Sequence, residues 1–212
     1  MRAVALARGG AVVWNHGGAA DDVQRLPGVV SVPSPASRYL VALGRAVAEL
    51  RPGARIAVLA APGRFFRLAL EGLEHEAAAI GWELVAEPAE ADAVVCCGPI
   101  QWEVDQLRRL AGTAALLGGI SPGLSAFPGL LGGDPEGLLA PVQWHGDVPA
   151  RPELGPDSVP LEDYVAAQAY AAALIAERCL ELDPEDPLAA ARGPRRARAL
   201  GPAGGSLARP AR

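Results

Sequence analysis

Two short segments carry residues in an order that could support ester hydrolysis. Gly119-Ile120-Ser121-Pro122-Gly123 fits the pattern G-x-S-x-G and follows a segment that predicts a strand, as the nucleophile of an α/β-hydrolase does. His16-Gly17-Gly18 is similar to the start of an oxyanion loop, and Asp134 and His145 come after the serine in hydrolase order.

The residue after the serine disfavours this chemistry. In a nucleophile elbow that residue donates its backbone N–H to the oxyanion, and Pro122 has no N–H to donate. Loss of one such donor costs about 10²–10³ in rate. We therefore expect no enzyme, and a serine hydrolase built on Ser121 stays as the enzymatic alternative.

The histidines and cysteines show no spacing typical of a metal site. The three histidines are scattered, and the pair Glu71 and His75 is typical of a solvated helix face. The cysteines, Cys96, Cys97 and Cys179, are too few for a disulfide framework and are expected to be small buried apolar residues. The glycine-rich turns match neither a dinucleotide fingerprint nor a phosphate loop. We expect no metal and no cofactor.

The loop after the first expected strand has a chemistry suited to binding. Trp14 could form an apolar wall, and Asn15 offers both a hydrogen-bond donor and an acceptor. Gly17 and Gly18 let backbone N–H groups approach a carboxylate closely. The loop also follows a strand end, where open α/β sheets hold their ligands. The alternative is an ordinary turn with a structural asparagine.

The composition excludes several classes of protein. All 19 basic residues are arginine, so the chain has no P-loop lysine, Schiff base or Ser-Lys dyad. The net charge of −5, with no basic stripe before the C-terminal region, argues against nucleic acid as a partner. The apolar stretch at the N-terminus stops at Arg8, too early for a signal peptide, and no apolar run is long enough to span a membrane.

Apolar segments rich in valine and isoleucine alternate with longer segments of helical periodicity. Strands are expected at residues 11–14, 29–32, 56–59, 82–85, 93–97, 114–117 and 142–144. Helices are expected at residues 37–50, 65–80, 102–110 and 161–182. This alternation predicts an α/β protein with parallel sheets flanked by helices. The periodicity ends after Pro187, and residues 191–212 are expected to form a disordered tail.

Six segments, taken in order, carry a family resemblance. They are Val12-Val13-Trp14-Asn15-His16-Gly17-Gly18, Val29-Val30-Ser31-Val32, Pro35-Ala36-Ser37-Arg38-Tyr39-Leu40, Arg55-Ile56-Ala57-Val58-Leu59, residues 128–139 and residues 163–170. Together they resemble the type I periplasmic-binding-protein family, and within it the leucine/isoleucine/valine and amide-binding solute receptors of ABC transporters. The resemblance covers about residues 10–190.

The resemblance implies a two-lobed protein whose α/β lobes close over an amino acid or small amide. Residues 1–50 would form an incomplete first lobe, residues 51–145 the second lobe, and residues 146–190 a return to the first lobe through the long helix. A hinge is then expected near residues 51–54. Members of the family begin with an export signal and two further βα units, so the resemblance also implies a chain truncated at both ends.

The resemblance also implies which residues meet the ligand. The loop Asn15 to Ala19 would meet the carboxylate and amino groups, and three segments at strand ends of the second lobe would supply the other side. The implied residues are Trp14, Asn15, His16, Gly17, Gly18, Ala19, Arg64, Phe65, Ile100, Gln101 and Ser121. Many amino-acid receptors of the family place a tyrosine and an acidic residue on the second lobe, where this chain has Phe65 and Ser121. The partner of the ligand's ammonium group is therefore open.

Partners and location follow from the same resemblance. It implies a small-molecule ligand and an ABC permease, with no nucleic acid and no direct membrane insertion. It places the protein outside the cytoplasm, whereas the chain as written shows no export signal and is cytoplasmic if its start is genuine. A cytoplasmic ligand-sensing domain of a regulator, which would share the fold, is the alternative function.

Overall fold

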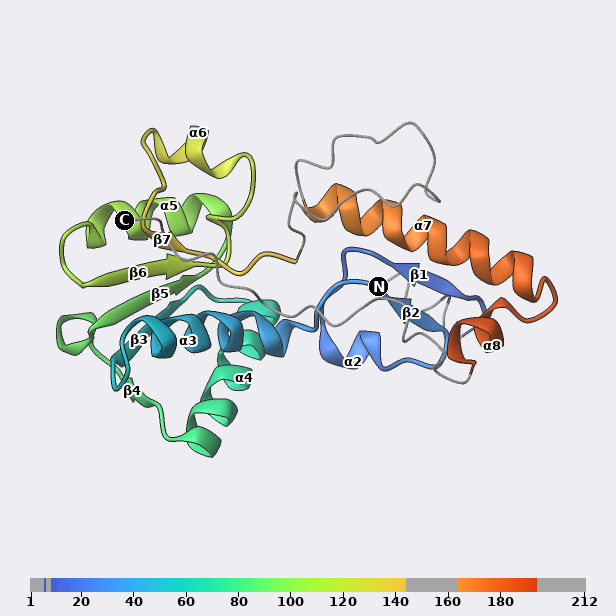
Figure 1. The fold of residues 1–212 in the computed structure, drawn as a ribbon, viewed down its shortest axis with the longest axis horizontal. Coiled ribbons are helices and arrows are strands. Elements are labelled where there is room, and N and C mark those ends of the chain that lie inside the picture. The colour runs from blue at the N-terminus through green and yellow to red at the C-terminus, as the bar shows by residue number, and fades with distance from the viewer. Residues whose placement is uncertain (1–5, 7–8, 144–163, 194–212) are drawn as a thin grey trace, which may run out of the picture.

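The computed structural model describes Leu6, residues 9–143 and residues 164–193, and it contains two separate parallel sheets (Figure 1). The smaller sheet pairs β1 (Val13–Asn15) with β2 (Val29–Ser31). The larger sheet has the order β4-β3-β5-β6-β7. Its strands are β3 (Arg55–Ala60), β4 (Glu83–Val85), β5 (Ala93–Cys97), β6 (Leu116–Gly119) and β7 (Leu138–Leu139). All pairings are parallel, which confirms the expected fold class.

Strand β5 lies at the centre of the larger sheet, and all five of its residues are buried. A continuous apolar strand of this kind requires cover on both faces of the sheet. Its alternating side chains place Cys97 in the core under α3 (Tyr39–Leu50) and α4 (Arg64–Ile80). Cys96 lies in the core under α5 (Ile100–Leu110) and α6 (Phe127–Leu131). The two neighbouring cysteines thus occupy opposite cores as small buried residues.

Helix α3 packs on the larger sheet. Its buried stripe of Leu40, Leu43 and Val47 lies in the same core as Ile56 of β3. The expected boundary at residue 50 assigned this helix to the first lobe and put a hinge at residues 51–54. The chain instead passes from one sheet to the other between β2 and the short helix η1 (Ala36–Arg38). Helical periodicity specifies an apolar face but not the sheet that this face covers.

The smaller sheet is accompanied by helices from both ends of the chain. Helix α2 (Asp21–Gln24) contacts β2, and α7 (Tyr164–Leu182) contacts β1 and the short α8 (Pro187–Arg192) (Figure 1). We call β1, β2 and these three helices the small unit. The large unit consists of strands β3–β7, helices α3–α6 and the short helices η1 and η2 (Pro88–Glu90). Helix α7, from the C-terminal part of the chain, thus packs beside β1 of the small unit.

Two local expectations differ from the structure, and others fall on residues that it does not describe. Val142 and Gln143 are irregular, and the last strand of the sheet is β7, four residues earlier. Helix α8 forms where the periodicity ended, because Asp186 caps it with a side-chain oxygen 2.8 Å from the N–H of Ala189 and Pro187 suits the first helical turn. The tail from residue 194 and the expected positions 144 and 161–163 lie outside the described residues.

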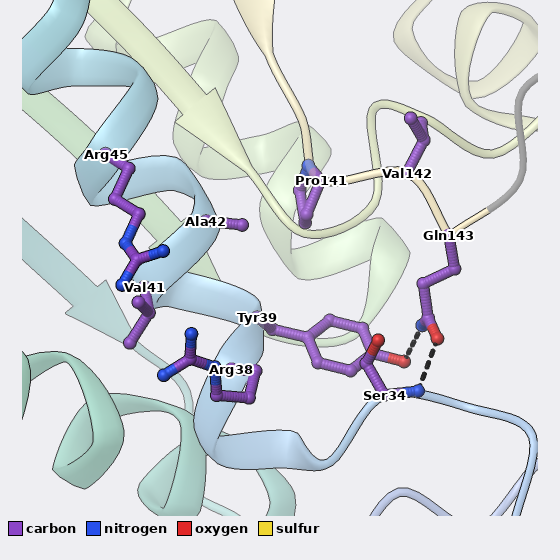
Figure 2. Close-up of a pocket in the computed structure, with 9 residues that line it drawn as sticks. All are labelled: Ser34, Arg38, Tyr39, Val41, Ala42, Arg45, Pro141, Val142 and Gln143. Atoms are coloured by element: carbon purple, nitrogen blue, oxygen red, sulfur yellow. Dashed lines mark hydrogen bonds between the residues drawn. The ribbon is translucent and has the colours of Figure 1, made fainter. Parts of the chain in front are cut away.

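Gln143 joins the segments that cross between the units (Figure 2). Its Oε1 accepts from the N–H of Ser34 at 2.7 Å and from Nε2 of Gln168 at 2.6 Å. Its amide nitrogen donates to the hydroxyl of Tyr39. Ser34 lies on the first crossing, Gln143 on the second and Gln168 on α7, so one side chain links all three.

Substitution of Gly72 tests the packing of α4 against η1. A Cβ at this position would lie 2.0 Å from the carbonyl oxygen of Ser37, so Gly72→Ala must push the two elements apart. Overpacking of this kind costs about 1–3 kcal/mol, measured as the free energy of unfolding in urea. Gly129→Ala is the matched control, because a Cβ there meets nothing within 4 Å. Equal stabilities of the two variants would contradict this packing.

Candidate functional site

The carboxyl ends of the strands in the two units face each other. In Figure 1 the arrows of β5 and β6 point toward the small unit. The guanidinium of Arg64, at the start of α4, forms an ion pair with the carboxylate of Asp22 in α2. Ligands of open α/β sheets bind outside the carboxyl ends of the strands. The two facing edges are therefore the candidate site.

On the small unit, Asn15 shapes the loop that follows β1. Its amide nitrogen donates to the carbonyl of Gly18 at 2.6 Å and to Oγ of Ser31 at 2.8 Å. Its Oδ1 accepts from the N–H of Gly18 at 2.8 Å. Both amide hydrogens of Asn15 are thus used within the protein. The asparagine therefore stabilises its own loop.

The remaining residues of this loop divide into exposed and covered ones. His16, Gly17 and Gly18 are exposed, Trp14 is half-buried, and Ala19 is buried with its carbonyl accepting from the N–H of Ala36 at 2.6 Å. Asn15 holds the exposed part in one conformation, and a Cβ on Gly18 would lie 2.9 Å from the Asn15 Oδ1. The exposed part of the loop is therefore held in one conformation by hydrogen bonds within the small unit.

On the large unit, Arg64 and Phe65 point to different surroundings. The Arg64 side chain is 55% exposed, and its hydrogen bond lowers the pKa of Asp22. A cavity of about 430 Å³ lies beside it, lined by residues 60–64, Arg67 and Leu70. Phe65 packs edge-on against Tyr39, with ring centroids 5.1 Å apart. Arg64 is therefore exposed at this edge, whereas Phe65 contributes to the core behind it.

The segment after β5 also combines one exposed and one covered group, whereas the residue named after β6 is buried. Gln101 is exposed and its amide donates to Oδ1 of Asp105 at 3.3 Å. Ile100 packs against the core under α5. Ser121 is only 5% exposed. All three lie just after β5 and β6, at the same edge as Arg64 after β3.

Glu103 is a residue of this edge that the sequence analysis missed. Its carboxylate is fully buried and accepts from three backbone N–H groups, those of Gly98 at 2.9 Å, Ile120 at 3.2 Å and Ser121 at 2.8 Å. Burial raises the pKa of this carboxyl, and the hydrogen bonds from these amides act in the opposite direction. An acidic residue within the apolar stripe of α5, beside Val104 and Leu107, is the signal that could have found it.

The residues of the alternative, a serine hydrolase, do not come together in the described part of the chain. The N–H of Ser121 is already bonded to Glu103, and Pro122 follows it. Asp134 is exposed and accepts from the N–H of Glu136 at 2.9 Å. His145 lies outside the described residues. The geometry offers no support for an oxyanion site at Ser121.

Two solved structures share this architecture. Leucine binding protein LivK from Thermotoga maritima MSB8 superposes with a TM-score of 0.65 at 16% identity, covering 84% of this chain and 60% of that one. A branched-chain amino acid ABC transporter protein from Silicibacter pomeroyi superposes with a TM-score of 0.60 at 15% identity, covering 81% and 54%. The chain has the type I periplasmic-binding-protein fold. It spans between half and two thirds of the length of these two proteins.

The chain's sequence similarity, its helices and its possible metal-binding groups were each compared with known patterns. Neither a protein-family model nor a curated protein matches the chain in sequence. In the described residues, no helix combines the length and the apolar character needed to cross a membrane. The same residues contain no group of three or more His, Cys, Asp or Glu side chains placed to hold a metal ion.

The buried cysteines give a test of the core beneath the site. Cys96 and Cys97 are fully buried, and burial together with the charge of Glu103 raises the pKa of each thiol to about 12. At pH 8 only about 10⁻⁴ of each thiol would be ionised, and the thiolate is the reactive form. We expect Ellman's reagent to leave both unmodified in the folded Cys179→Ser variant and to label both in guanidinium chloride. Rapid labelling without denaturant would contradict this core.

Proposed function

We propose that this chain acts as a solute receptor that binds an amino acid or small amide between its two units for an ABC importer. The observation that carries the proposal is the pair of facing strand edges joined by Arg64 and Asp22. The structural neighbours support it, because one is named as a leucine binding protein and the other as a branched-chain amino acid ABC transporter protein. A receptor of this type works outside the cytoplasm with a membrane permease as its partner.

The proposed contacts come from the exposed groups of both edges. On the small unit these are His16, Gly17 and Gly18, held by Asn15 between Trp14 and Ala19. On the large unit they are Arg64 and Gln101, backed by Phe65, Ile100 and Ser121. Polar groups on both sides suit a small polar solute, because such a ligand loses its water when the units close and needs a partner for each polar atom.

The ion pair itself suggests how a zwitterion would bind. Arg64 and Asp22 carry opposite charges on opposite units, and both are more than half exposed. The carboxylate of an amino acid can replace Asp22 as the partner of Arg64, and its ammonium group can pair with Asp22. This assignment gives the ammonium group a partner that the sequence left open. A neutral amide would leave the ion pair in place and bind through Gln101 and the loop.

A ligand screen tests the proposal. Amino acids, their amides, acetamide and urea are added to the 212-residue chain in a thermal-shift assay, and positives are titrated by calorimetry. We expect zwitterionic amino acids to raise the midpoint of unfolding most, since ligand bound to the folded state stabilises it by mass action. No shift with any member of this panel would overturn the proposed function.

Charge-neutralising variants test the assigned contacts. Asp22→Asn and Arg64→Gln each remove one charge-assisted hydrogen bond to a zwitterion, so the dissociation constant should rise about tenfold. Arg178→Gln is the control, because Arg178 pairs with Glu181 at the far end of α7. Unchanged affinity in both test variants, with binding retained in the wild type, would remove Arg64 and Asp22 from the site.

A further inference from the structure

Glu103 is a buried ionisable residue that makes no direct contact in the proposed binding mode. Its Oε1 accepts from the N–H groups of Gly98 and Ile120, and its Oε2 accepts from that of Ser121. Gly98 belongs to the loop between β5 and α5, whereas Ile120 and Ser121 leave β6. One side chain on α5 therefore joins two separate loops at the edge where the ligand is proposed to bind.

The carboxylate of Glu103 supplies hydrogen-bond acceptors to buried backbone amides. In the part of the chain that the structure describes, the groups acting on Glu103 are backbone amides and the Ser121 hydroxyl, and no arginine or histidine is among them. A buried charge without a cation costs desolvation that an apolar side chain would avoid. In return it satisfies three buried N–H groups, each of which would cost free energy if it were left without an acceptor.

Neighbouring glycines allow the loops to approach this close. A Cβ on Gly119 would lie 2.8 Å from Oε2 of Glu103, and a Cβ on Gly98 would lie 2.2 Å from the ring of Trp102. Any larger residue at either position would move its loop away from the start of α5. The carboxylate and the two glycines thus form one arrangement that defines the backbone path at this edge.

We propose that Glu103 is a positioning residue, which holds the loops at Gly98–Gln101 and Ile120–Ser121 in the conformation that receives the ligand. This inference rests on the proposed function. Glu103 acts through these loops and is too deeply buried to touch the ligand itself.

Amide hydrogen exchange on the full chain tests the positioning. Glu103→Gln keeps the shape of the side chain, but its amide nitrogen accepts no hydrogen bond, so at least one of the three N–H groups loses its acceptor. We expect exchange at Gly98, Ile120 or Ser121 to accelerate at least about tenfold relative to the protein average. Leu107→Ala is the matched control, because it removes a buried side chain one turn further along α5 and leaves the carboxylate in place.

The two variants and the wild type separate the possible outcomes. Faster exchange at these three amides in Glu103→Gln but not in Leu107→Ala, with at least about tenfold weaker binding of L-leucine, supports the inference. Unchanged exchange at the three amides, or unchanged affinity, overturns it. If the wild type binds neither L-leucine nor acetamide, the proposed function fails for these probes, and the exchange data alone decide whether Glu103 holds the loops. Should Glu103→Gln not fold, rapid exchange of these amides in the wild type would overturn the inference.

Discussion

Strand β5 is buried along its whole length, and the remaining architecture follows from this constraint. A strand covered on both faces needs neighbours on both sides and helices above and below the sheet. Its neighbours β3 and β6 both run parallel to it, β6 following through α5 and β3 preceding it through α4 and β4, so these strands end at the same edge. The chemistry of the large unit is therefore collected at one edge, where Arg64, Gly98 and Ser121 follow successive strands.

Rigid loops at this edge come from polar side chains that serve the backbone. Glu103 accepts from amides after two strands of the large unit, and Asn15 closes the loop after β1 in the small unit. Both side chains use their hydrogen-bonding groups inside the protein. The exposed His16, Arg64 and Gln101 are thereby left on supported backbone, as preorganised binding requires.

Much of the large unit could be predicted from the sequence, and the reasons are local. The run Ala93–Cys97 is apolar without interruption, a pattern typical of a buried parallel strand, and the alternation within it sends Cys96 and Cys97 to opposite cores. The helix at 64–80 ends at Gly81, whose φ of +78° suits the residue after a helix. Periodicity and stop signals are properties of short segments and need no knowledge of tertiary contacts.

The failures depend on contacts between distant segments. Whether the apolar stripe of α3 covers the small or the large sheet depends on packing against α4, which periodicity does not encode. The partners of Glu103 lie on the loops that follow two different strands, 5 to 18 residues away. From the sequence, the Asn15 amide could bind a ligand or its own loop equally well. In the structure it donates to Oγ of Ser31, sixteen residues later, a contact that no local pattern predicts. The ion pair of Asp22 with Arg64 depends on the position of α2 relative to α4, which local sequence patterns do not encode.

The central claim is that one small solute contacts both facing edges at once. Titration of the isotope-labelled chain with L-leucine, followed by backbone-amide NMR shifts, tests this claim most directly. The account predicts simultaneous, saturable shifts of the amides of residues 15–19 in the small unit and of Gly98, Ile100, Gln101 and residues 119–121 in the large unit. Shifts confined to one unit, or centred on the cavity lined by Arg38, Arg45 and Pro141, would contradict it.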